Sequence, residues 1–577
     1  MFFNLASLQT HLNPKSIVRL LHQIELSRYS LLLLTLFIIS WISTALGGFS
    51  YTSFYTQWLE IPLVLYIYAV FFHLQRHSRW RAVIAALPII LFYLVHDGFF
   101  LAYSKVFRWI NAHELPELLQ VLPWHYSIVV SIILFIPPLI LLYLINLRPT
   151  RTRLLLILPA LSFLLFLFIA PAEFEKGFRL AASEVVKYSD AKSVERNGRL
   201  AMTLLREAER LQVTRQMSPY RDRTAYDNDA HTKAAYLQKH GNKQNVHLIV
   251  LESFLDPTLF YAAKFSQAPA HPDFTEFFKD SLGLSIAPMF GGATSQSEFE
   301  VLCGVPGFEK LSSIEFNVFT GAPAFCLPGV LALDGYRTIG ANAYKPNFFN
   351  ALTAYKGIGF SELHFPREFY AGATYLSTGD VGVEEFQFDA DLFSQNLAMV
   401  RRARRDNPAK PLFNYLMTIY GHTPHLLDPQ QRPEFIKVIA SSQDDHFIRS
   451  TNQFYYRTKA IADFVKELIK IDKQSLIILV ADHVPPLRYG PNTFNELRYL
   501  DNIERSYYHN RIMIIENGSP KKYPVLHHYD MPDVIQNYLT NGQYCQTQPC
   551  FFQAKTSRPA RDTFTEAYLR LLAHASE

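Results

Sequence analysis

The chain has 577 residues, of which 49% are hydrophobic and 18% charged, and its formal net charge is +5. This length exceeds one ordinary domain, and the mean hydropathy of +0.04 averages a very apolar N-terminal part with a polar remainder. The charge is too small for this length to indicate nucleic-acid binding, so we exclude a nucleic-acid partner. A slightly basic chain suits anionic lipid headgroups instead.

The N-terminal part contains predominantly apolar segments of roughly 17–21 residues, about the length that a helix needs to cross a bilayer. They are 29–47, 58–74, 83–103, 126–146 and 153–171. Lys and Arg cluster before the first segment, after the second and after the fourth, which predicts that these ends are cytoplasmic. We therefore expect five spans, with the chain after about residue 172 outside the cytoplasm. No cleavable signal peptide is evident before the first span.

The third predicted span carries the ionisable pair His96 and Asp97. Charged groups are costly in hydrocarbon and usually face a partner or a cavity. One interpretation is a polar site near the outer leaflet that admits a lipid headgroup. The other, which we favour slightly, is a hydrogen bond between helices near the interface.

A charged, helix-favouring stretch from Glu173 to Gln212 follows the last predicted span. It predicts an amphipathic connector that lies along the membrane. An ordinary solvated linker would explain the same composition equally well. We thus expect a membrane domain over 1–172, a connector over 173–240 and an external domain over 241–577.

From Asn245 onward, short β-rich runs alternate with segments of helix length. Several of these runs are almost continuously apolar, as buried strands are. We expect strands at Val246–Leu251, Arg337–Ala341, Leu412–Thr418, Leu476–Ala481 and Arg511–Ile515. This alternation of strand-like runs and helix-length segments predicts an α/β domain with a largely parallel sheet.

The four cysteines form two pairs that are close in sequence. Cys303 and Cys326 follow a glycine-rich turn, and Cys545 and Cys550 bracket four residues. Two local disulfides would fit an oxidising compartment outside the cytoplasm. Four free, buried thiols are the alternative, and no C-x-x-C zinc pattern is present.

Thr294 lies after the turn Gly291-Gly292 and before a helix-favouring run. Ser295 and Glu298 have the spacing of an S-x-x-E capping box, which predicts that a helix starts there with Thr294 at its N-terminus. Helix N-termini attract anions, so a threonine at this place could hold a phosphate ester if a metal ion bound its oxygen.

Acidic residues directly follow two of the predicted strands, Glu252 after the first and Asp482-His483 after the fourth. Ligands gather at the carboxyl ends of strands in sheets of this kind. Each signal alone is more often a cap or a loop residue. Together with the Thr294 hydroxyl, however, they could surround one divalent cation that lowers the threonine pKa.

Four short motifs occur in a fixed order along the chain. They are Leu251-Glu252-Ser253-Phe254, Thr294-Ser295-Gln296-Ser297-Glu298-Phe299, Gly421-His422-Thr423-Pro424 and Ala481-Asp482-His483. With the apolar segments and connector, this set resembles the lipoteichoic acid synthase and phosphoglycerol transferase group of the alkaline phosphatase and sulfatase superfamily. The likeness covers nearly the whole chain.

The resemblance implies roles for individual residues. Thr294 would be the nucleophile, and Glu252, Thr294, Asp482 and His483 would bind a single divalent cation, usually manganese. Magnesium or zinc would also suit these donors. His422 would contact the substrate phosphate or assist the leaving and attacking oxygens.

The chain departs from the family pattern in the headgroup pocket. Ala351 occupies the place of a family arginine within the run Asn350–Lys356, so a bidentate phosphate clamp is missing there. Lys345 could supply a charge without the same geometry. The segment from Cys303 to Cys326 is more similar to Gram-negative phosphoglycerol transferases that decorate periplasmic glucans, which favours a multi-pass inner-membrane protein with a periplasmic catalytic domain.

The sequence thus predicts a transferase that moves phosphoglycerol from phosphatidylglycerol to a cell-envelope glycan. A covalent intermediate on Thr294 would form, and diacylglycerol would be released. The alternatives are a phosphoethanolamine transferase that acts on lipid A or another envelope glycan, and a sulfatase-fold hydrolase, although the C-x-P-x-R or S-x-P-x-R motif of sulfatases is absent. A membrane scaffold or lipid-handling protein is the non-enzymatic alternative.

Overall fold

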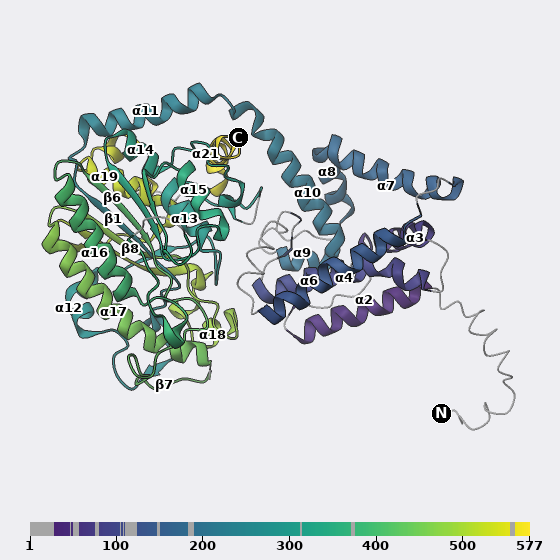
Figure 1. Ribbon diagram of the computed structural model, residues 1–577, viewed down its shortest axis with the longest axis horizontal. Coiled ribbons are helices and arrows are strands. Elements are labelled where there is room, and N and C mark those ends of the chain that lie inside the picture. The colour runs from purple at the N-terminus through teal and green to yellow at the C-terminus, as the bar shows by residue number, and fades with distance from the viewer. Residues whose placement is uncertain are drawn as a thin grey trace. The chain divides into compact units, whose positions relative to one another are not determined.

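The computed structural model divides into two compact units, Met1–Arg215 and Gln216–Glu577 (Figure 1). It describes residues 28–46, 48–49, 57–75, 80–103, 106–107, 109, 124–146, 150–182, 190–311, 314–370, 375–442, 444–553 and 560–577. We refer to the two units as unit 1 and unit 2.

A helix coincides with each of the apolar segments predicted in unit 1. These helices are α2 (Arg28–Ala45), α3 (Glu60–Leu74), α4 (Arg81–Tyr103), α6 (Trp124–Leu144) and α7 (Arg151–Ile169). Two of them, α2 and α4, are long and apolar enough to cross a membrane; a third span results if α7 and the following α8 (Pro171–Ala181), bent by 112° between them, count as one. The apolar helical unit is confirmed, whereas five spans remain a prediction.

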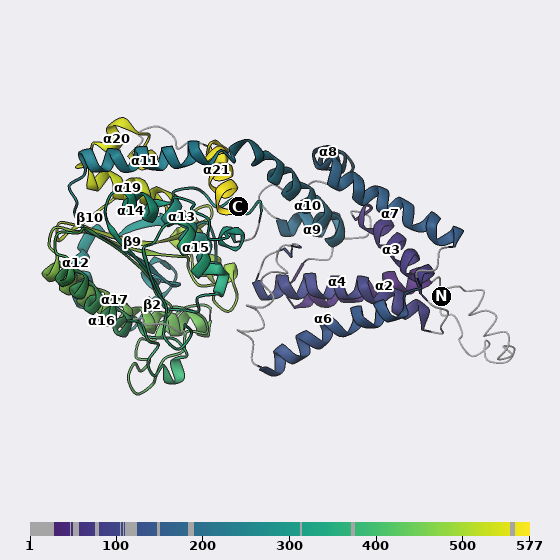
Figure 2. The same cartoon turned by 45° about the horizontal axis from the view of Figure 1, so that its top comes forward.

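The helices of unit 1 pack through apolar side chains. Helix α4 contacts α2, α3 and α6, and Figure 2 shows α2, α4 and α6 close together. Leu36 of α2, Tyr68 of α3 and Ile89 of α4 belong to one buried cluster. Large apolar side chains of α7, among them Leu155 and Leu165, are exposed. Exposed apolar surface of this extent is typical of a helix that faces lipid.

The stretch predicted as a connector is mostly helical in the residues that the structure describes. It contains α8, α9 (Asp190–Asn197) and α10 (Arg199–Gln216). Helix α10 is amphipathic, because Met202, Leu205 and Ala208 are buried while polar residues alternate with them. An amphipathic helix that buries one face in this way is docked on its neighbours, which an ordinary solvated linker is not.

A buried ion pair joins the start of α10 to α4. Arg199 Nη2 donates to Asp97 Oδ2 at 2.8 Å, and Arg199 Nε donates to the other oxygen at 2.5 Å. The Glu60 carboxylate accepts the backbone N–H groups of Leu200 and Ala201 at 3.0 and 2.8 Å, which satisfies the helix N-terminus. Asp97 therefore makes the contact between helices that was the favoured interpretation, and its partner is a guanidinium.

The main sheet of unit 2 has nine strands in the order β11-β3-β9-β8-β1-β6-β4-β5, and β10 pairs with β9. Strand β1 is parallel to β6 and β8, and β4 is parallel to β5 and β6, whereas β9 is antiparallel to β8, β3 and β10. The strands are β1 (Val246–Leu251), β3 (Gly283–Ile286), β4 (Arg337–Asn342), β5 (Glu362–His364), β6 (Leu412–Met417), β8 (Leu476–Ala481), β9 (His509–Glu516), β10 (Ser519–Lys521) and β11 (Leu526–His527). The predicted strands correspond to β1, β4, β6, β8 and β9, so the mostly parallel α/β fold is confirmed.

Helices cover both faces of this sheet (Figure 1). One face carries α12 (Pro272–Phe278), α16 (Asp389–Asp406) and α17 (Asp445–Ile471); the other carries α11 (Arg223–His240), α13 (Thr294–Cys303), α14 (Leu327–Leu333), α15 (Ala351–Gly357) and α19 (Met531–Leu539). The remaining helices are α18 (Pro491–Glu496), α20 (Tyr544–Thr547) and α21 (Thr565–Ala575). A short second sheet pairs β2 (Lys264–Phe265) with β7 (Val438–Ile439).

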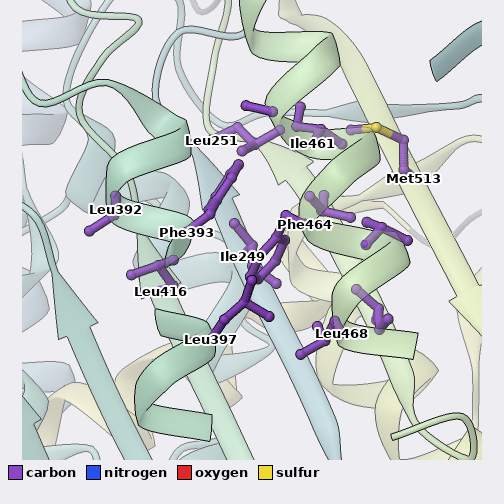
Figure 3. Close-up of a cluster of buried hydrophobic side chains, with 14 of the residues drawn as sticks. Ile249, Leu251, Leu392, Phe393, Leu397, Leu416, Ile461, Phe464, Leu468 and Met513 are labelled. Carbon is purple, nitrogen blue, oxygen red and sulfur yellow. The ribbon is translucent and has the colours of Figure 1, made fainter. Parts of the chain in front are cut away.

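A large apolar cluster lies between the central strands and the pair α16 and α17 (Figure 3). Ile249 and Leu251 of β1 meet Phe393 of α16 and Phe464 of α17 there, and the two phenyl rings stack at 4.4 Å. Strands buried on both faces need this nearly continuous apolar sequence, which is why they could be predicted.

Both predicted disulfides form. Cys303, the last residue of α13, is bonded to Cys326, which precedes α14. Cys545 is bonded to Cys550. The alternative of four free thiols is therefore wrong.

Replacing Asp97 with alanine leaves Arg199 buried without its partner, so we expect unit 1 to lose about 3–5 kcal/mol of stability. All five tryptophans lie in unit 1, so tryptophan fluorescence during denaturation of the full chain in detergent reports on this unit alone. The control is Glu209→Ala, which breaks the partly exposed pairs with Arg179 and Arg206 and should cost about 0–1 kcal/mol for each pair. Equal stability of the Asp97 and Glu209 variants would contradict the role of the buried pair.

Candidate active site

The pairing of β1 with β8 brings the two acidic motifs together. The strands are parallel and Leu251 is opposite Ala481, so the next residues, Glu252 and Asp482, leave the same edge of the sheet side by side. Both carboxylates are buried. This edge is the one at which parallel sheets hold ligands.

Thr294 reaches this edge of the sheet through a tight turn. Gly291, Gly292 and Ala293 have φ values of 70°, 155° and 59°, and the left-handed Ala293 leads directly into α13. A Cβ on Gly291 would lie 2.9 Å from Pro486 Cβ, so the turn needs glycine for space as well as for φ. Thr294 is thus the first residue of α13, and its Oγ1 donates to Glu252 Oε2 at 3.0 Å.

The predicted capping box is wrong in its details. The residue before the helix is Ala293, and no side chain caps this end. Ser295 lies inside the helix and donates to Glu298 Oε2 at 3.1 Å. The other Glu298 oxygen accepts the hydroxyls of Tyr355 and Tyr415, so this carboxylate is used by the core and does not reach back to the helix start.

Backbone and hydroxyl donors that the sequence did not reveal hold the two carboxylates in place. Asp482 Oδ1 accepts the backbone N–H groups of Ser253 and His483 at 2.7 and 2.6 Å. Ser253 Oγ donates to Glu252 Oε1 at 2.8 Å. Ser253 stands in the quoted Leu-Glu-Ser-Phe motif, but its donor role depends on a positive φ of 46°, which a sequence pattern does not show.

Glu252, Asp482 and His483 place possible ligand atoms within 4.8 Å of one another, which makes them a candidate cation site. His483 Nδ1 lies 3.0 Å from the Val484 carbonyl and must donate to it. In the neutral ring the Nε2 lone pair then faces Asp482 Oδ2 at 3.2 Å. Two hydrogen-bond acceptors that face each other in this way need a proton or a cation between them. As metal ligands, these oxygen and nitrogen atoms suit manganese, magnesium or zinc.

The electrostatics of the site favour a bound cation. Burial raises the pKa of the Asp482 carboxyl to about 7. The pKa of Glu252 is raised by burial and, second, by the charge of Asp482. A divalent cation would compensate the charges of both carboxylates and thereby remove the free-energy cost of burying them in the ionised form.

His422 lies on the loop after β6, as predicted. Its Nδ1 is 2.8 Å from the Thr423 carbonyl, its ring is 5.0 Å from Phe386, and its charge acts to lower the pKa of Glu252. A Cβ on Gly421 would overlap the Glu252 carbonyl oxygen. The Gly-His motif therefore needs glycine because this loop packs directly on the end of β1.

Lys345 is placed on the loop after β4, and the structure does not join it to the carboxylates by a described contact. Its Nζ lies 5.6 Å from the Tyr344 ring and 5.9 Å from the Phe369 ring. Ala351 is buried at the start of α15. Its methyl group offers no hydrogen bond to a phosphate, so Ala351 cannot replace the arginine that the family pattern has at this place.

A family model described as "Sulfatase" matches residues 244–540. This is more than half of the chain, and the chain therefore belongs to the sulfatase family. The predicted membership of the alkaline phosphatase and sulfatase superfamily is confirmed.

Individual relatives are more distant. A protein of Rhizobium meliloti named "Putative cyclic beta-1,2-glucan modification protein" is 26% identical over 43% of this chain and 37% of its own length. The chain spans about a third of the curated relatives that it matches. Among solved structures, the phosphoglycerol transferase GacH of Streptococcus pyogenes has a TM-score of 0.45 at 17% identity, with 61% of this chain and 91% of that chain covered. The lipoteichoic acid synthase LtaP of Listeria monocytogenes has a TM-score of 0.43 at 16% identity, with 52% and 72% covered.

We expect Asp482→Asn to weaken Mn²⁺ binding by more than about 100-fold, because even changes to groups that only orient metal ligands cost 10–100-fold. Isothermal titration of the full chain with MnCl₂ measures this change. Glu300→Gln is the matched control. Glu300 is a buried carboxyl on α13 with its pKa raised to about 8 by burial, so glutamine mimics its protonated form and Mn²⁺ affinity should not change. Equal affinities of wild type and Asp482→Asn would exclude the trio as the metal site.

Proposed function

We propose that the protein transfers phosphoglycerol from phosphatidylglycerol to a cell-envelope glycan through a covalent intermediate on Thr294. The observation that carries this proposal is the hydrogen bond of 3.0 Å from Thr294 Oγ1 to Glu252, at a helix N-terminus beside the trio Glu252, Asp482 and His483. A nucleophilic hydroxyl, a candidate cation site and an anion-attracting helix end in one place are the requirements of phosphoryl transfer.

The residues divide the reaction between them. A divalent cation on Glu252, Asp482, His483 and Thr294 would act as a Lewis acid that lowers the hydroxyl pKa and neutralises the phosphoryl oxygens. In the first step, Thr294 Oγ1 gives its proton to solvent water and bonds to the donor phosphorus. The bond from phosphorus to the diacylglycerol oxygen breaks, and this oxygen takes a proton from His422.

In the second step, an acceptor hydroxyl bonds to the phosphorus and gives its proton to His422. The bond to Thr294 Oγ1 breaks, and the threonine takes a proton from solvent water. His422 suits both tasks, because its Nδ1 is engaged by the Thr423 carbonyl and Nε2 remains to exchange protons. Lys345 would add positive charge for the headgroup, because Ala351 occupies the place of the arginine that clamps the phosphate in the family pattern.

The choice of donor and acceptor is supported by chemistry and by one relative. The apolar helices of unit 1 would keep the enzyme next to a lipid donor, which raises its effective concentration. The Rhizobium relative is named for glucan modification, which supports a glycan acceptor. A sulfatase-type hydrolase is disfavoured, because Thr294-Ser295-Gln296 does not fit the sulfatase nucleophile motif. A phosphoethanolamine transferase would use the same threonine and differ in headgroup alone.

We also propose the topology that such a reaction needs. Five spans over 1–172, with cytoplasmic positive loops, would place the connector and the catalytic domain outside the bacterial inner membrane. The two disulfides of unit 2 support an oxidising compartment such as the periplasm. Manganese is the cation that the family resemblance implies.

Mass spectrometry of the Thr294 peptide tests the donor. Full-length protein is incubated with Mn²⁺ and vesicles of phosphatidylglycerol and phosphatidylethanolamine, without a glycan, so that the second step is blocked. We expect a phosphoglycerol adduct on Thr294 and release of diacylglycerol, both of which Thr294→Ala abolishes. Ser295→Ala, which removes the neighbouring hydroxyl, should keep the adduct.

Other results would point to the alternatives. A phosphoethanolamine adduct would assign the protein to the other transferase class. Absence of both adduct and diacylglycerol, in protein that binds Mn²⁺, would contradict the transfer proposal and favour a scaffold or lipid-handling role.

A further inference from the structure

A second buried ion pair lies directly behind the candidate active site. Arg457 of α17 is 2% exposed and Asp389, the first residue of α16, is 0% exposed. Arg457 Nε donates to Asp389 Oδ2 at 2.7 Å. Replacing a buried ion pair with apolar residues is often neutral or stabilising, so stability alone does not explain this pair beside an otherwise apolar cluster.

The guanidinium also contacts the backbone that carries a candidate metal ligand. Arg457 Nη1 donates to the Glu252 carbonyl oxygen at 2.8 Å. The contact is to the main chain, so it fixes the end of β1 while both carboxylate oxygens of Glu252 stay directed at Ser253 and Thr294.

The same guanidinium touches the His422 loop. A Cβ on Gly421 would overlap both Arg457 Nη1 and the Glu252 carbonyl oxygen. Three backbone segments thus meet at one planar group: the end of β1, the loop after β6 and, through Asp389, the start of α16. Lysine has one charged nitrogen and cannot bond to Asp389 and to the Glu252 carbonyl with the same geometry.

We propose that Arg457, oriented by Asp389, is a positioning residue that sets the Glu252 carboxylate and His422 relative to each other. It touches neither substrate nor the reacting atoms. This inference rests on the proposed transfer reaction, in which Glu252 helps to bind the cation and His422 moves the protons. A misplacement of about 1 Å at such a site can cost about 100-fold in rate.

The test is Arg457→Lys in the full-length protein, with Mn²⁺ and phosphatidylglycerol vesicles. We expect kcat for diacylglycerol release to fall about 10–100-fold and Mn²⁺ affinity, titrated directly, to fall about 10-fold. KM for the lipid should change by less than about two-fold, because lipid contacts are not altered.

Arg511→Lys is the matched control. Arg511 Nε donates to Asp256 Oδ2 at 2.6 Å in a mostly buried pair of the same unit, and no described contact joins Arg511 to Glu252 or to the His422 loop. This variant should lower thermal stability to a similar degree and leave kcat and Mn²⁺ affinity unchanged. If Arg457→Lys does not fold, the same kcat and Mn²⁺ affinity are measured for Asp389→Asn. This variant keeps the side-chain volume and removes the charge that orients Arg457.

Two results would overturn the inference: wild-type kcat and Mn²⁺ affinity in Arg457→Lys, or equal losses of both in Arg511→Lys. Failure of the proposed function is a separate outcome. A wild-type protein that releases no diacylglycerol would contradict the transfer reaction, whereas the comparison of Mn²⁺ affinities would still test the role of Arg457.

Discussion

The parallel register of β1 and β8 is the constraint on which the candidate site depends. It places two buried carboxylates, Glu252 and Asp482, at the same edge of the sheet. Their mutual repulsion has to be compensated, and four hydrogen-bond donors contact them: two backbone N–H groups, the Ser253 hydroxyl and the Thr294 hydroxyl. A cation bound at this candidate site would complete the compensation.

Helix α13, which begins at Thr294, is held in place along its length. Ser297 Oγ donates to the Asp482 carbonyl at 2.6 Å, Glu298 binds two tyrosines of the core, and Cys303 ends the helix in a disulfide. Thr294 therefore has little freedom to move away from Glu252. Such preorganisation lowers the cost of reaching the transition state.

Unit 1 also contains buried carboxylates that are satisfied by hydrogen-bond donors, and there they hold helices together. Asp97 and Glu60 lie among apolar helices, and both are satisfied by the start of α10, through Arg199 and through two backbone N–H groups. Buried charges that find such partners specify one arrangement of the helices. The connector up to Arg215 is therefore part of unit 1, and the start of α10 is positioned by polar contacts within an apolar surrounding.

The sequence by itself determined the features that depend on local pattern. Continuous apolar runs gave β1, β4, β6, β8 and β9, apolar length located the helices of unit 1, and the motif order led to Glu252, Thr294, His422 and Asp482-His483. The close sequence spacing of the cysteines indicated both disulfides. These signals are runs, motifs or spacings that can be read along the chain without knowledge of its three-dimensional path.

Only the tertiary structure decided the features that depend on distant partners. The capping box was predicted from spacing, but Glu298 is drawn to Tyr355 and Tyr415, which are far away in sequence. Arg199 and Arg457 are ordinary charged residues of amphipathic helices in the sequence, and their buried partners Asp97 and Asp389 lie 102 and 68 positions away. The short strands β3, β5, β10 and β11 carry too few residues for a pattern. A side chain's partner is fixed by the three-dimensional path of the backbone, which no local pattern contains.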